Sequence, residues 1–225
     1  MGKLILLGLP IGNLGDLTDR VKNALIEGEN FVVEDTRSFG RLLSLLGIKR
    51  ENKKFISFHD HSNQKKTEFL LSKLDAGETL YLASEAGSPL ISDPGYPLVR
   101  KALAKGHQLE SYPGISSVPV ALELSGLPPL PFGFHGFLPR KKEAKKKFIS
   151  SLPAGTTHIF FEGKSRVENS LQILSETHPH AQVAVCRELT KKFQKTHRFL
   201  AKDLDTHLKN ISLKGEFVLL FYINQ

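Results

Sequence analysis

Short apolar runs alternate with amphipathic segments of helical length over the first half of the chain. Strands that alternate with helices are typical of a doubly wound parallel sheet. We therefore predict a first α/β domain, residues 1–113, with a mainly parallel five-stranded sheet. Four glycines fall just past the predicted helices, where helices commonly end: Gly28, Gly47, Gly77 and Gly106. The predicted strands cover residues 4–9, 31–34, 55–58, 79–83 and 107–112.

The second half has more strands for each helix. An apolar helix-length stretch at 118–126 and the proline-rich "LPPLP" at 127–131 lead into it. Because the strands outnumber the helices that would connect parallel neighbours, we predict a mixed sheet in a second α/β domain, residues 114–225. Its predicted strands cover residues 132–137, 157–163, 182–189, 196–201 and 216–223, with a basic helix, a helix over 167–177 and one from about Asp203 between them.

Composition fits a folded, water-soluble protein. The 225 residues are 40% hydrophobic and 24% charged. A single cysteine, Cys186, excludes an internal disulfide. The apolar run at the start of the chain is too short for a signal peptide or a membrane span. We therefore expect a cytoplasmic protein without a membrane partner.

Positive charge is concentrated in the second half. The net charge is +8, of which residues 1–112 contribute +1 and the remainder +7. The excess lies in "RKKEAKKK" (140–147) and in a second group: Arg187, Lys191, Lys192, Lys195 and Arg198. Such asymmetry favours a polyanionic partner, nucleic acid before membrane, with any base stacking left to Phe193 or to arginines. The alternative is a solvated basic face that aids solubility.

Four polar loops follow the predicted strands of the first domain: 10–16, 34–37, 59–61 and the kinked "SEAGSPLISDPGYP" at 84–97. In a parallel sheet these loops emerge at one edge, where α/β proteins bind ligands. The first loop reads G-x-x-G, which argues against a dinucleotide fingerprint, and no P-loop follows. His59 and His61 lack further clustered ligands, so we predict no metal site.

Two of these segments have a second interpretation. Glu34, Asp35 and Arg37 either orient a substrate or cap the helix that follows. Ser116 and Ser117 either cap a helix or face a ligand carboxylate at its N-terminus.

Seven motifs occur in order along nearly the whole chain: "PIGNLGDLT", "EDTR", "EAGSPLISDPGYPLVR", "SGLP", "GFLPRK", "RELTK" and "GEFVLL". This set resembles the tetrapyrrole-methylase-like class of S-adenosylmethionine (SAM) methyltransferases. Within that class it is most similar to the bacterial group that methylates the ribose 2′-hydroxyl of a cytidine in small-subunit (16S) rRNA. The resemblance implies two α/β domains with SAM in the cleft between them, a homodimer, and an rRNA or 30S-subunit substrate.

The resemblance also implies roles for individual residues. The cofactor-binding set is Pro10, Gly12, Glu85, Gly87, Ser88, Ile91, Ser116, Ser117, Phe161, Glu162, Arg187, Glu188 and Glu216. The substrate-binding set is Asn13, Arg37, His59, Arg140, Lys141, Lys164, Arg166 and Lys191. Methyl transfer from a sulfonium needs positioning more than a nucleophilic side chain. The candidates for accepting the hydroxyl proton are Glu34, Asp35 and Asp93, with His59 beside them.

The chain departs from the family pattern in three places. It has "EAGSP" at 85–89 where the family usually reads Asp-Ala-Gly-Thr-Pro, and "FEGKSR" at 161–166 for Tyr-Glu-Ser-Pro-His-Arg. Members of the group also often continue past "GEFVLL" into a helical extension. Two alternatives therefore stay open: a corrin or porphyrin C-methyltransferase, and a SAM-binding, RNA-associated module without catalysis.

Overall fold

The computed structural model describes residues 1–59 and 64–224. The chain divides into two compact units, Met1–Ser116 and Ser117–Gln225. The boundary drawn from the sequence lies three residues earlier. Asp60 and His61, in the loop after the third predicted strand, lie outside the described residues.

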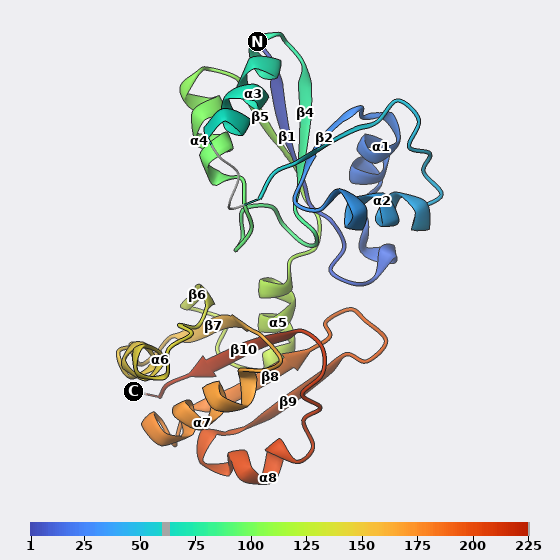
Figure 1. Ribbon diagram of the computed structural model, residues 1–225. Helices are drawn as coiled ribbons and strands as arrows, with labels where there is room; N and C mark the ends of the chain where they lie inside the picture. The colour runs from blue at the N-terminus through green and yellow to red at the C-terminus, as the bar shows by residue number, and fades with distance from the viewer. Residues whose placement is uncertain (60–63, 225) are drawn as a thin grey trace. The chain divides into compact units, whose positions relative to one another are not determined.

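The first unit is built on a five-stranded parallel sheet of order β3-β2-β4-β1-β5 (Figure 1). This confirms the predicted sheet and its direction. The strands are β1 (Lys3–Leu7), β2 (Asn30–Val33), β3 (Lys54–Ser57), β4 (Thr79–Ala83) and β5 (Gln108–Tyr112).

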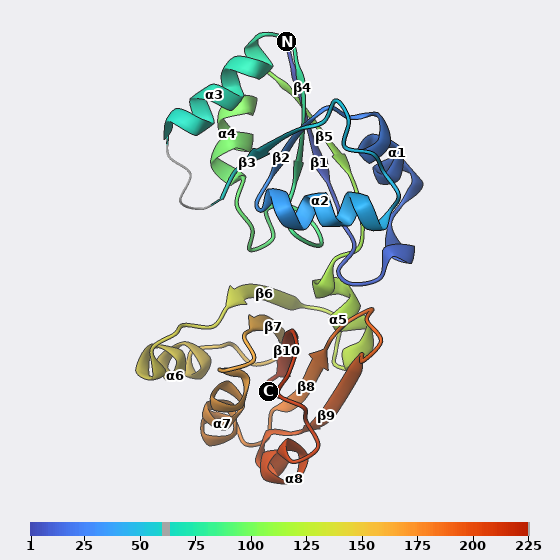
Figure 2. The ribbon, with the colours of Figure 1, turned by 45° about the vertical axis from the view of Figure 1, so that its right-hand side comes forward.

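Helices cover both faces of this sheet (Figure 2). Side chains alternate along each strand, so Leu4 packs in a cluster with Leu70 and Leu98, whereas Ile5 packs with Val21 and other residues of the opposite face. The helices are α1 (Asp19–Glu27) and α2 (Thr36–Leu45) on one side, α3 (Gln64–Asp75) and α4 (Tyr96–Ala104) on the other, and a short 3₁₀ turn, η1 (Leu14–Asp16).

Glycine ends these helices in two ways. Gly47, Gly77 and Gly106 have φ of +69°, +84° and +78°, the left-handed conformation that closes a helix. Gly28 instead has φ −67°, and a Cβ there would lie 2.6 Å from the Ala24 carbonyl oxygen. Gly28 is therefore needed for space.

The second unit has a mixed five-stranded sheet of order β6-β7-β10-β8-β9, as predicted. β6 and β7 are parallel and the remaining neighbours are antiparallel. The strands are β6 (Phe132–Phe137), β7 (Thr157–Glu162), β8 (Gln182–Arg187), β9 (Lys195–Leu200) and β10 (Phe217–Tyr222).

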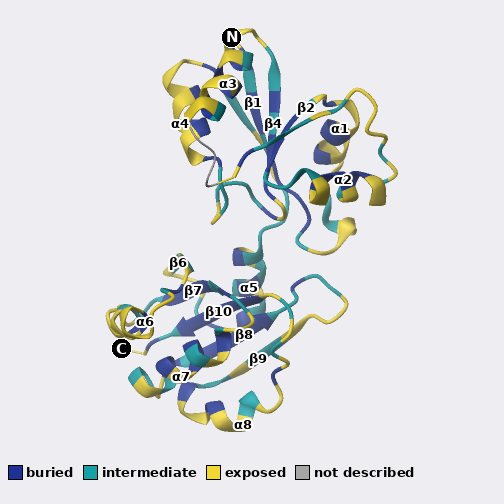
Figure 3. Cartoon of the chain, in the orientation of Figure 1, coloured by how far each residue is buried: buried dark blue, intermediate teal, exposed yellow. Residues whose placement is uncertain are grey.

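The main buried cluster of the second unit lies on the face of its sheet that α6, α7 and α8 cover (Figure 3). Phe160, Leu171 and Phe221 belong to this buried cluster. α5 packs on β10, β8 and β9, and its Ala121 carbonyl lies 3.7 Å from the buried Cys186 Sγ. The helices are α5 (Ser117–Ser125), α6 (Lys142–Ser150), α7 (Val167–Thr177) and α8 (Leu204–Leu208), with a 3₁₀ turn, η2 (Ala201–Asp203), before α8. No helix in the described ranges is long and apolar enough to span a bilayer.

Candidate functional site

The loops after β1 and β4 are joined at the carboxyl edge of the first sheet. Leu9 and Gly87 form an isolated antiparallel bridge. The Leu9 amide donates to the Gly87 carbonyl with an N···O distance of 2.9 Å, and the Gly87 amide donates to the Leu9 carbonyl at 3.0 Å. Gly87 has φ +73°, and a Cβ there would lie 3.3 Å from Ile11 Cγ2. The Gly87 amide therefore has its hydrogen-bond partner within the protein. The bridge thus anchors the kinked loop beside Pro10 and Gly12.

The kinked loop carries unusual backbone conformations. Leu90 and Ser92 have φ of +72° and +65°, and Gly95 has φ +129° at the N-terminus of α4. A Cβ on Gly95 would lie 2.9 Å from both Leu82 Cδ2 and Leu90 Cδ2. Non-glycine residues held in this region cost of order 1–3 kcal/mol each and concentrate at ligand sites. Ile91, between the two strained residues, is exposed, and its amide lies 3.4 Å from the Ser88 carbonyl.

A small pocket opens where β1, β2 and β4 end. It brings together carboxylates from two different strands, Glu34 and Asp35 after β2 and Glu85 after β4. Ser84, which is buried, donates to the Ala86 carbonyl at 3.1 Å and shapes the same turn. The pocket is lined by Leu9, Val33, Glu34, Asp35, Ser38, Phe39, Leu42, Ser84 and Glu85.

Asp35 caps α2. Its Oδ1 accepts hydrogen bonds from the Arg37 amide at 2.6 Å and the Ser38 amide at 3.1 Å. The backbone hydrogen bond from Ser38, followed by that from Arg37, lowers the pKa of Asp35 below its ordinary 3.8. The helix-capping interpretation thus describes Asp35, and a carboxylate stabilised in its charged form is a weaker base. The Arg37 side chain is 93% exposed.

Other predicted residues of the first unit lie at the same edge. Asn13 Oδ1 accepts from the Gly15 amide at 2.9 Å and caps η1. Asp93 is half-buried in the kinked loop, and His59 is exposed after β3. Within the described ranges, neither of these two lines the pocket.

The "YPGIS" segment runs against the loop after β1. Gly8 and Gly114 touch so closely that a Cβ on Gly8 would lie 2.4 Å from the Gly114 amide nitrogen. Thr18 Oγ1 donates to the Pro113 carbonyl at 3.3 Å. This packing holds the chain leading to Ser116 beside the G-x-x-G loop. Ser117 is the first residue of α5.

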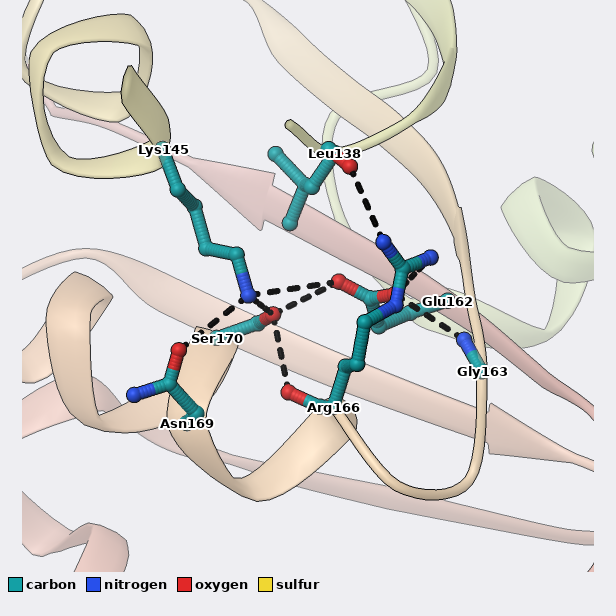
Figure 4. Close-up of polar contacts among 7 residues, drawn as sticks. All are labelled: Leu138, Lys145, Glu162, Gly163, Arg166, Asn169 and Ser170. Atoms are coloured by element: carbon teal, nitrogen blue, oxygen red, sulfur yellow. Dashed lines mark hydrogen bonds and ion pairs between the residues drawn. The ribbon is translucent and has the colours of Figure 1, made fainter. Parts of the chain in front are cut away.

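In the second unit, Glu162 lies at the centre of a buried polar network (Figure 4). Its Oε1 lies 2.6 Å from Arg166 Nη2 and accepts from the Gly163 amide at 2.9 Å. Its Oε2 accepts from Ser170 Oγ at 2.7 Å and lies 3.7 Å from Lys145 Nζ. Both oxygens are engaged within the unit. Glu162 therefore positions the loop after β7. Its predicted cofactor contact stays a prediction.

Lys145 corrects the interpretation of the first basic run. Its side chain is 2% exposed, and its ammonium donates to Ser170 Oγ at 2.8 Å and Asn169 Oδ1 at 3.2 Å (Figure 4). Burial lowers its pKa, and the charge on Glu162 opposes that shift. α6 buries Lys145 and Ile149, four residues apart on one helical face, so this lysine cannot reach a polyanion.

A second polar cluster of this unit is held by ion pairs and by contacts with the backbone. Its members are Arg187, Glu188, Lys191 and Glu216. Lys191 Nζ lies 3.2 Å from Glu188 Oε1 and 2.8 Å from Glu216 Oε2. Burial is the largest single influence and opposes the charge on Lys191, but the contacts with Glu216 and Glu188 together outweigh it and raise the pKa of Lys191. Arg187 Nη1 donates to the Phe193 carbonyl at 3.1 Å. The charge of Lys191, a predicted substrate-binding residue, is therefore already balanced by these two carboxylates.

The other predicted basic residues are open to solvent. Arg140 and Lys141 follow β6 and Lys164 follows β7, and all three are exposed. Phe161, at the end of β7, is half-buried. Among the residues the structure describes, no group of three or more His, Cys, Asp or Glu is placed to hold a metal ion.

Comparison with known proteins identifies relatives over the whole chain. A protein named ribosomal RNA small subunit methyltransferase I from Rickettsia prowazekii is 40% identical over 218 residues, 96% of this chain and 77% of that protein. A protein of the same name from Mycoplasmopsis pulmonis is 36% identical and is matched over the full length of both chains.

Solved structures share the fold at low sequence identity. The methyltransferase CobJ superposes with a TM-score of 0.71 at 19% identity, covering 99% of this chain and 95% of that one. A Thermus thermophilus uroporphyrin-III C-methyltransferase complexed with S-adenyl homocysteine gives 0.60 at 14% identity, covering 99% and 97%. The family model for tetrapyrrole (corrin/porphyrin) methylases matches residues 3–205. The chain therefore belongs to the tetrapyrrole methylase family.

Proposed function

We propose that this protein transfers a methyl group from SAM to the ribose 2′-hydroxyl of a cytidine in small-subunit rRNA. The observation that carries the proposal is 36–40% identity, over nearly all of the chain, to proteins named for small-subunit rRNA methylation. The second unit supplies the positive charge that a polyanionic substrate needs. A cytoplasmic homodimer, acting on rRNA or the 30S subunit, is part of the proposal.

The carboxyl edge of the first sheet has the chemistry to hold SAM. SAM carries a sulfonium and an ammonium, and when bound it supplies an electrophilic methyl group. Glu34 and Glu85 provide negative charge in one pocket. The Leu9–Gly87 bridge and the close contact of Gly8 with Gly114 bring backbone segments together where side chains would not fit. The proposed cofactor residues here are Pro10, Gly12, Glu85, Gly87, Ser88, Ile91 and Ser116.

Glu34 is the proposed proton acceptor. It lines the pocket beside Glu85, whereas the neighbouring Asp35 is held charged by two backbone amides. Hydrogen bonds to the charged form weaken proton affinity, so Asp35 is a poorer base than an ordinary carboxylate. Holding the ribose hydroxyl in line with the breaking bond supplies most of the acceleration, and Glu34 removes the proton as the new bond forms.

The exposed cations of the second unit are the proposed phosphate contacts. Arg140, Lys141 and Lys164 are exposed, so they are available to RNA. Lys145 is buried and Lys191 is paired with Glu216, so we leave these two residues out of the proposed phosphate contacts. A porphyrin or corrin, the alternative substrate, would need only enough exposed cations to balance its carboxylates.

A direct test is incubation of the purified protein with radiolabelled SAM and one of two acceptors. Small ribosomal subunits from cells lacking the gene should become labelled, and uroporphyrinogen III should not. Label in the porphyrinogen alone would assign the protein to the C-methyltransferases. SAM binding by calorimetry without label in either acceptor would favour a non-catalytic module.

A further inference from the structure

Three phenylalanine rings lie together on the second sheet. The rings of Phe134 and Phe161 are 4.8 Å apart between centroids, and those of Phe137 and Phe161 are 5.7 Å apart. Phe160 points into the core beneath α6–α8, so the adjacent Phe161 points to the opposite face. α5 packs on that opposite face over β10, β8 and β9. β6 and β7 lie at the end of the sheet away from β8 and β9, and Phe137 remains 56% exposed.

A β-bulge brings Phe137 to this face. Phe134 pairs with Ile159 and Phe137 with Phe161, so β6 uses three steps where β7 uses two. Gly136, with φ +68°, accommodates the extra residue. Regular alternation would turn Phe137 to the side of His135, whose ring stacks on Phe160 at 4.9 Å. The bulge therefore places Phe137 on the face of Phe134 and Phe161 rather than on the face of His135 and Phe160.

Basic residues follow both strands that carry these rings. Because β6 and β7 are parallel, the segments that follow them leave the sheet at the same edge. Arg140 and Lys141 lie in one segment and Lys164 in the other, all exposed. The Arg166 guanidinium lies 5.9 Å from the centre of the Phe137 ring. Exposed aromatic rings beside basic side chains are how proteins bind unpaired nucleotides, by stacking the base and neutralising the phosphate.

We propose that Phe137, supported by Phe134 and Phe161, stacks on an unpaired base of the rRNA substrate. The inference rests on the proposed function and adds the element that holds the RNA strand. RNA is favoured over an apolar protein surface because exposed basic residues follow both strands that carry the rings.

The test compares Phe137→Ala and Phe137→Leu with Phe69→Ala, using the full chain and small ribosomal subunits from cells lacking the gene. Phe69 is a matched control: it is 49% exposed on α3 and has a cation, Lys73, 5.5 Å from its ring centre. Loss of one stacked base should lower kcat/KM for the subunit roughly 5- to 100-fold in both Phe137 variants. Phe137→Tyr and Phe69→Ala should stay near wild type, and the affinity for SAM should not change in any variant.

Three results would overturn the inference. The first is wild-type kcat/KM for the subunit in Phe137→Leu. The second is a weakened affinity for SAM in that variant, which would make the ring a cofactor contact. The third is an altered sedimentation coefficient, which would make it a contact between copies of the chain. These outcomes differ from failure of the proposed function, in which the wild-type protein itself leaves the subunit unlabelled.

Discussion

The guanidinium of Arg166 lies 2.6 Å from the carboxylate of Glu162, whose side chain is fully buried at the end of β7. These two residues are four apart, and they are the part of "FEGKSR" that keeps the family pattern. Their contact, with Ser170 and Lys145 on the second oxygen, fixes the loop that carries Lys164. The family glutamate and arginine thus have a structural reason to occur together in this chain.

Glu162→Gln should destabilise the second unit strongly. The substitution leaves the buried Lys145 ammonium without its counter-charge, and removal of one partner from a buried ion pair costs about 3–5 kcal/mol. Glu176→Gln is the matched control, because Glu176 pairs with Lys146 at 3.6 Å on the exposed side of α6 and both are about half exposed. The control should cost less than about 1 kcal/mol. Urea unfolding measures both, and equal losses would contradict the network.

Gly87→Ala should weaken SAM binding, whereas Gly47→Ala should lower only the stability of the fold. Gly87 and Gly47 have nearly the same φ, +73° and +69°, so alanine at either position costs about 1–2 kcal/mol in stability. A Cβ at Gly47 meets nothing within 4 Å, whereas one at Gly87 presses on Ile11 in the candidate cofactor loop. Calorimetry should show a raised Kd for SAM in Gly87→Ala alone. A similar Kd in both variants would remove the kinked loop from the cofactor site.

Glu34→Gln should lower kcat for methylation of small subunits. Loss of a general base typically reduces the rate about 10²- to 10⁴-fold. Asp35→Asn is the control, since asparagine is also a good N-cap and the charge of Asp35 serves the helix. Steady-state methylation of small subunits measures both. A larger loss in Asp35→Asn than in Glu34→Gln would reverse the assignment.

The charge on Asp35 should stabilise the first unit in a pH-dependent way. Its pKa is lowered in the folded protein by the Ser38 and Arg37 amides. The folded state therefore holds the proton less tightly than the unfolded chain. The stabilisation by the Asp35 charge is complete at pH values above the ordinary pKa of 3.8, and it is lost as pH falls through the lower pKa of the folded state. Thermal unfolding of wild type and Asp35→Asn should differ at pH 7 and converge near the acid limit. A difference that is constant with pH would contradict the capping charge.

The strands could be predicted because buried strands leave continuous apolar runs, and the parallel first sheet followed from the helices between its strands. "FVLLFY" in β10 and "TLYLA" in β4 are examples of runs that have few other uses in a folded chain. The candidate site at the carboxyl edge followed from the same pattern, since polar residues come directly after β2 and β4 and a glycine-containing loop follows β1.

The remaining features depend on tertiary contacts that a linear pattern does not record. Lys145 sits among exposed lysines, and only the packing of α6 on α7 buries it. Asp35 rather than Glu34 caps α2 because the helix begins at Thr36, and a linear pattern does not fix the first residue of a helix to within one position. The left-handed Leu90 and Ser92 carry residue types that rarely adopt this conformation, so no local signal marks them. The bulge at Gly136 appears in the sequence only as a break in the Phe alternation of "FGFHGF".

The central claim is methylation of one ribose in small-subunit rRNA. Mass spectrometry of nucleosides from small-subunit rRNA, prepared from cells with and without the gene, tests it most directly. The account predicts the loss of one 2′-O-methylcytidine without the gene and its return when the wild-type protein, but not Glu34→Gln, is supplied. Unchanged 2′-O-methylcytidine in cells lacking the gene would contradict it.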